Sequence, residues 1–178
     1  LSQSLTNYLD SVVVNNNDPR FPTISEDYKT KIVNLGLVVG MMRAVVPRNG
    51  DEILYRPRPE GASRVSKQLA RLGQALCLLL KKPCVDEEVY RLIRKTALDT
   101  VRGYMLEIAH RLITHQLLTG GGMTTDEITD RLQLAKTTVV RKLKDLQALG
   151  AITSEADTDH DEPGRKPIVW TASEPFLE

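Results

Sequence analysis

The chain has 178 residues, enough for one large domain or two small ones. Its net charge of +1 excludes the globally basic surface of a non-specific DNA-packaging protein. It has no apolar run of about eighteen residues, no basic-then-apolar signal segment and only two cysteines. We therefore expect a cytoplasmic protein with reduced thiols and no membrane partner. The start without Met indicates a piece of a longer protein.

Residues 1–99 predict a bundle of helices, which we take as the first domain. The segment 23–26 (Thr-Ile-Ser-Glu) is a capping-box pattern, and the helix after it carries apolar residues as far as Val45. Ser63 is positioned to cap a long amphipathic helix that Pro83 ends. Asp86 is positioned to cap the next helix. The first domain is therefore expected to be helical throughout.

Residues 100–178 predict a second domain that also begins with helices. Because one helix from Asp86 to Leu118 would be too long for a small domain, we expect a break near residue 99 and a new helix capped by Thr100. Thr124 and Glu127 then form a capping-box pattern before a short helix. A turn over residues 134–136 leads to a second helix that opens at residues 137–138.

The end of this second helix is followed by the pattern of a β-hairpin. Gly150 stops the helix, and two short apolar stretches, 151–153 and 168–170, flank an acidic loop that contains Pro163 and Gly164. Helix, turn, helix, glycine, strand, loop and strand is the order of a winged helix-turn-helix. Such a domain places its second helix in the major groove of double-stranded DNA. The predicted fold class is therefore mainly α, a helical bundle followed by a winged helix-turn-helix with a small β-hairpin wing.

The helical period predicts which residues would contact DNA. With Val140, Leu143 and Leu146 turned inward, polar and basic residues fall at the helix start or on its outer side. Free N–H groups and the helix dipole favour an anion at that start, and an arginine can bond guanine at two atoms. The wing's return strand adds two basic residues. The candidate DNA-binding residues are Lys136, Thr137, Thr138, Arg141, Lys142, Lys144, Arg165 and Lys166.

The segment that contains the predicted winged helix is slightly acidic overall, which weighs against DNA binding. Residues 123–170 hold seven Lys and Arg against nine Asp and Glu. Five of the acids lie in or beside the wing loop, where they would repel a phosphate backbone: Glu155, Asp157, Asp159, Asp161 and Glu162. Winged helices also serve as docking modules for other proteins, so a protein partner is an alternative to DNA.

Two segments of the first domain resemble a known family. These are residues 60–72, which contain Ser63-Arg64 and, five residues after Arg64, Leu69, and residues 84–90, which contain Val85-Asp86-Glu87-Glu88. They resemble the lid region of AAA+ ATPases of the minichromosome-maintenance helicase type, in which a winged helix follows the lid. The resemblance implies that Arg64 is a nucleotide-sensing arginine that reaches the γ-phosphate of ATP on a neighbouring subunit.

The catalytic parts of that family are missing from this sequence. It has no phosphate-binding loop and no acidic strand before the lid-like segment, so we expect no ATP hydrolysis by this chain. ATP would then be a cofactor of the longer protein only. The alternative is that Arg64 is an ordinary surface arginine, paired with Glu60. No catalytic set is recognisable, and the three histidines have no metal-ligand spacing.

These observations lead to one main hypothesis and two alternatives. The main hypothesis is a non-catalytic C-terminal part of a nucleotide-dependent DNA-processing protein, with an AAA+ core or further copies of itself as protein partners. The first alternative is a free-standing transcriptional regulator in which residues 1–118 form a helical dimerisation or effector domain. The second is a winged helix that docks a protein.

Overall fold

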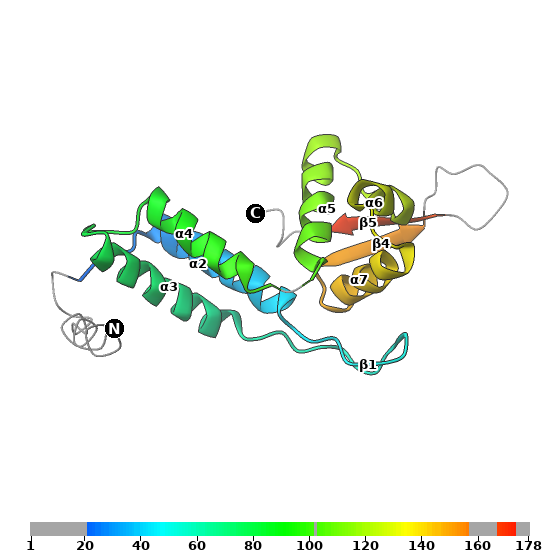
Figure 1. Cartoon of the computed structure of the whole chain (residues 1–178), viewed down its shortest axis with the longest axis horizontal. Coiled ribbons are helices and arrows are strands. Elements are labelled where there is room, and N and C mark those ends of the chain that lie inside the picture. The colour runs from blue at the N-terminus through cyan, green and yellow to red at the C-terminus, as the bar shows by residue number, and fades with distance from the viewer. Residues whose placement is uncertain (1–20, 102, 157–166, 174–178) are drawn as a thin grey trace.

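The protein is mainly helical with small antiparallel sheets (Figure 1). The computed structural model describes residues 21–101, 103–156 and 167–173. Residues 21–101 form the helices α2 (Glu26–Met42), α3 (Ala62–Leu79) and α4 (Glu87–Asp99). None of the helices in the described ranges is long and apolar enough to cross a membrane.

The helices α2, α3 and α4 enclose one hydrophobic cluster. It is centred on side chains with almost no exposed surface: Val39, Val65, Cys77, Val89 and Ile93. Helices α2 and α3 approach closely because α2 carries glycine at the contact. A Cβ atom on Gly40 would lie 2.8 Å from the carbonyl oxygen of Glu60, closer than real Cβ atoms come. The spacing between α2 and the start of α3 therefore depends on the missing side chain.

A β-hairpin connects α2 to α3. Strand β1 (Arg48–Asn49) pairs antiparallel with β2 (Glu52–Ile53), and Gly50 turns the chain with a φ of 60°. The Leu54 N–H donates to the Pro47 carbonyl at 3.0 Å and closes the hairpin. We call residues 47–54 the hairpin arm. Figure 1 shows that it extends away from α2 and α3 toward the second part of the molecule.

The described residues from 103 onward form three helices and a three-stranded sheet. The helices are α5 (Met105–Thr119), α6 (Thr125–Leu132) and α7 (Lys136–Ala148). The strands are β3 (Met123–Thr124), β4 (Ile152–Ala156) and β5 (Ile168–Ala172). They pair antiparallel in the order β3-β5-β4, so that Trp170 of β5 lies opposite both Met123 and Ser154.

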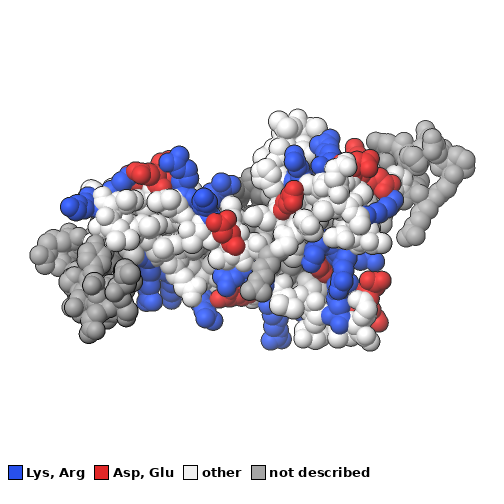
Figure 2. Space-filling model, viewed as in Figure 1, with Lys and Arg blue, Asp and Glu red and all other residues white. Residues whose placement is uncertain are grey.

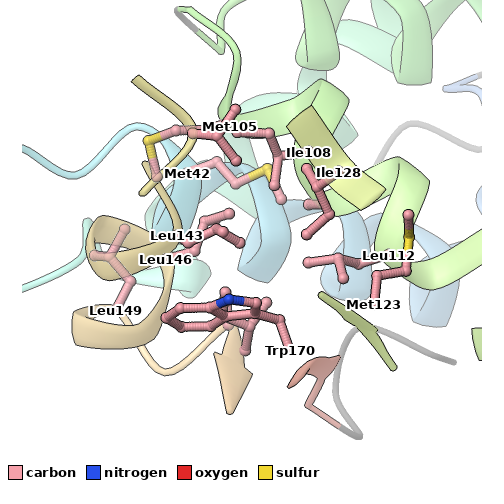
Figure 3. Close-up of a cluster of buried hydrophobic side chains, with 14 residues drawn as sticks. Met42, Met105, Ile108, Leu112, Met123, Ile128, Leu143, Leu146, Leu149 and Trp170 are labelled. Atoms are coloured by element: carbon pink, nitrogen blue, oxygen red, sulfur yellow. The ribbon is translucent and has the colours of Figure 1, made fainter. Parts of the chain in front are cut away.

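A second hydrophobic cluster lies between the helices and the sheet of this part (Figure 3). Met123 of β3 is fully buried in it, together with side chains from α5, α6 and α7: Ile108, Leu112, Ile128, Val139, Leu143 and Leu146. Met42, the last residue of α2, belongs to the same cluster and is only 3% exposed. Helix α2 therefore ends inside the core of the second part, across the boundary expected at residue 99.

Several expected helix limits and faces are wrong by a few residues. Ser63 does not cap α3, since the helix begins at Ala62 after Gly61. Thr100 is the C-cap residue of α4 and does not cap a new helix. Gly103 has a left-handed conformation with a φ of 69°, and α5 begins only at Met105. Val45 lies beyond the end of α2 and is 83% exposed. The expected Thr23–Glu26 capping box does not form, because α2 begins at Glu26 directly after Ser25, whose side chain makes no capping bond.

The expected capping box at the start of α6 is present. The Glu127 N–H donates to the Thr124 hydroxyl oxygen at 3.3 Å, and the Glu127 carboxylate accepts from the Thr124 N–H at 2.7 Å. That backbone bond to the charged carboxylate lowers the pKa of Glu127 below its ordinary value. The start of α6 is thereby fixed directly after β3.

This lowered pKa predicts a pH dependence of stability. The bonded carboxylate stabilises the fold above the ordinary pKa of glutamate, about 4.3, and the contribution is lost as the pH falls through the lower value of the folded state. Glu127→Gln should therefore flatten the loss of stability between about pH 5 and pH 3, measured by urea unfolding at several pH values. Glu107→Gln, an exposed acid in the first turn of α5, is the control. Equal slopes for Glu127→Gln and the natural protein would contradict the assignment.

Candidate nucleic-acid interface

Helix α7 has a buried side and an outer side. Val139, Leu143 and Leu146 are fully buried in the second core. Successive residues of an α-helix are rotated by about 100° around its axis. Arg141 therefore projects from the side of α7 opposite to these three core residues. Leu143 and Leu146 are buried as expected, but one residue of the predicted inward face was misassigned. Val139 is the core residue, whereas Val140 is half-buried on the outer flank.

Three of the predicted DNA-binding residues share the outer side of α7. Thr137, Arg141 and Lys144 are all exposed and follow one another at helical spacing. We call these three residues the outer face of α7. Among the described residues, neither Arg141 nor Lys144 forms an ion pair. Two unneutralised cations and a hydroxyl on one helical face can contact phosphates and base edges.

The other predicted residues on α7 do not join this face. Lys136, the first residue of α7, is exposed and pairs with Asp126 at the start of α6. Thr138 and Lys142 are half-buried and, together with Arg141, line a cavity of about 870 Å³ between α7, the end of α2 and the start of α5. The Lys142 ammonium donates to Asp145 at 3.2 Å. Arg165 and Lys166 lie outside the residues that the structure describes.

A buried ion pair joins the hairpin arm to α7. Arg48 donates from Nε and Nη2 to one carboxylate oxygen of Asp145, at 2.9 and 2.5 Å. Both side chains are almost fully buried, with 7% and 6% of their surfaces exposed. Arg48 also donates to the backbone carbonyl oxygens of Arg141 and Asp51. The arm is thus bonded to both the side chains and the backbone of α7.

The tip of the arm lies over the outer face of α7. A cleft of about 150 Å³ separates Arg48 and Asp51 of the arm from residues of α7. Those residues are Thr137, Val140, Arg141 and Lys144. Figure 1 shows the arm on the side of α7 that faces away from α5 and α6. In Figure 2, Lys and Arg side chains gather between α7 and the arm, with acidic side chains beside them.

The Arg48–Asp145 pair was not predicted from the sequence, although one feature of α7 indicated that Asp145 needs a partner. Asp145 is the only acidic residue of α7, and it stands between the core residues Leu143 and Leu146. A carboxylate beside a buried stripe needs a partner, because burial of an unpaired charge is costly. The partner itself was not predictable, since Arg48 is 97 positions away.

Arg64, the nucleotide-sensing residue implied by resemblance, lies in the first turn of α3. Its side chain is 75% exposed, as the resemblance leads one to expect. It is not free of carboxylates, however, since its Nε lies 3.5 Å from Glu60 Oε1. That local pair is what the alternative interpretation expects. Arg64 belongs to the start of α3 and does not contribute to the interface on α7.

Known proteins offer no guide to the role of this interface. No protein-family model, no curated protein and no solved structure matches the chain.

Proposed function

We propose that residues 105–172 form a winged helix-turn-helix and that the protein binds double-stranded DNA through the outer face of α7. The order α5, β3, α6, α7, β4 and β5 supports the proposal, because it matches helix, turn, helix and β-hairpin. The observation that carries it is the exposure of Thr137, Arg141 and Lys144 on one side of a helix whose other side is fully buried.

The turn between α6 and α7 supports the same proposal. Gln133 adopts a left-handed conformation with a φ of 53°, which ends α6 and lets α7 begin three residues later. No side chain caps the start of α7, so its first N–H groups remain available to an anion. A phosphate of the DNA backbone would be held there next to Lys136.

The longer-protein hypothesis rests on Arg64. An exposed ion pair of this kind contributes about 0–1 kcal/mol, so Glu60 would not keep the guanidinium from a phosphate. We therefore retain the proposal that the chain is the lid-like and DNA-binding part of a nucleotide-dependent protein. The coding sequence upstream of Leu1 tests it. A phosphate-binding loop there supports it, whereas a start codon at that point favours the regulator.

Titration of a labelled 20-base-pair duplex with the full chain, followed by fluorescence anisotropy, tests the DNA proposal. We expect binding in the micromolar range at low salt that weakens steeply as salt is added. The double variant Arg141→Ala/Lys144→Ala should lose about 1–3 kcal/mol of binding free energy, because a base contact and a phosphate contact are removed.

The matched control removes two cations from another helix. Arg91→Ala/Lys95→Ala changes the net charge equally at two exposed positions of α4. It should leave DNA affinity within about threefold of the natural protein, since exposed charges farther away than a Debye length are largely screened. Equal losses in the two double variants would overturn the assignment of α7. Absence of binding at low salt would favour the protein-docking alternative.

A further inference from the structure

The hairpin arm lies where DNA would have to approach α7. The core residues define one side of α7, and the arm is bonded to the other side through Asp145 and the carbonyl oxygen of Arg141. Its tip, including Asp51, faces Thr137 and Lys144 across a narrow cleft. A major groove is about 12 Å wide and admits a single helix or a two-stranded ribbon. A helix with a hairpin held over its outer face is wider than that.

The charges of the arm argue against a role in holding DNA. Asp51 and Glu52 at its tip are both exposed, and they would repel a phosphate backbone. The only basic residue of the arm is Arg48, whose guanidinium is committed to Asp145. The arm therefore places one acidic group, Asp51, in the cleft beside the cations that the phosphates would meet.

We propose that the hairpin arm is an autoinhibitory cover for the outer face of α7, held by the Arg48–Asp145 pair, and that duplex DNA and the arm compete for this face. The inference rests on the proposed function. Arg141 and Lys144 are exposed to water beside the arm, and release of the arm would let a DNA groove reach both side chains and would remove Asp51 from the cleft next to them. The affinity measured for the natural protein then includes the free energy of displacing the arm.

The arm connects this cover to the rest of the molecule. It joins α2 to α3, and α2 ends with Met42 inside the core of the DNA-binding part.

Arg48→Met tests the proposal in the full chain. The substitution keeps an apolar stem in the buried position and removes the bonds to Asp145, whose remaining partner is Lys142. Loss of a positive charge alone would weaken DNA binding, but release of the arm should raise the affinity for a 20-base-pair duplex by about fivefold or more. Arg58→Met, which removes one exposed positive charge outside the arm, is the control and should not raise affinity.

A second measurement needs no substitution, and it applies even if Arg48→Met does not fold. In the natural protein, the NMR signal of the Arg48 Nε–H should be protected by its bond to Asp145 and should lose that protection when duplex DNA is added. Unchanged or weaker binding by folded Arg48→Met, or an Arg48 signal that persists in the complex, would overturn the cover while leaving the DNA proposal intact. If neither protein binds duplex DNA, the DNA proposal itself fails, and the cover with it.

Discussion

Replacement of Asp145 by alanine is expected to lower the free energy of unfolding by about 3–5 kcal/mol. The substitution leaves the Arg48 guanidinium buried without the carboxylate that accepts two of its hydrogen bonds. It also removes the partner of Lys142. Urea denaturation followed by circular dichroism measures the loss.

Asp130→Ala is the matched control for this prediction. Asp130 is an exposed acid near the end of α6 and forms no ion pair among the described residues. Its replacement should change stability by no more than about 0.5 kcal/mol. A loss below about 1 kcal/mol for Asp145→Ala would show that the arm is not bonded to α7 in solution.

Replacement of Trp170 by alanine is expected to cost about 3–5 kcal/mol, the second large effect. Trp170 lies in the centre of β5, is 4% exposed and packs in the second core (Figure 3). Its indole N–H donates to the Thr125 hydroxyl at 2.9 Å, which ties the sheet to the start of α6. The substitution opens a large cavity and removes this bond.

Trp170→Phe separates the two contributions. Phenylalanine keeps most of the apolar volume and lacks the N–H donor, so its cost should lie well below that of alanine. Thermal unfolding monitored by circular dichroism is suitable, because it does not depend on Trp170 as the probe. Similar costs for the two variants would indicate that the bond to Thr125, rather than packing, dominates at this position.

The sequence predicted the local features of the fold well. The capping box of Thr124 and Glu127 and the cap at Asp86 formed as expected, because both depend on residues three positions apart. Gly150 follows α7 in a left-handed conformation, with a φ of 78°. The start of α3 was predicted wrongly because two nearby residues, Gly61 and Ser63, can each precede a helix. Gly61 is the one that precedes α3.

Long-range features were beyond the sequence. On α7, Leu143 and Leu146 were predicted correctly as core residues, but Val140 was chosen in place of Val139. The two valines are chemically alike, and only the three-dimensional core distinguishes them. The contact between Arg48 and Asp145 joins two segments far apart in the chain. Consequently the exposure of Thr137 and Lys144 could be predicted, but the arm that lies over them could not.

Mapping of duplex DNA onto the protein by NMR is the most direct test of the central claim. Backbone amide signals of the full chain are recorded as a 20-base-pair duplex is added. The account predicts that the largest changes fall on residues 136–144 of α7, accompanied by changes in the hairpin arm as it is displaced. Changes confined to α3 and α4, with α7 unaffected at saturating DNA, would contradict it.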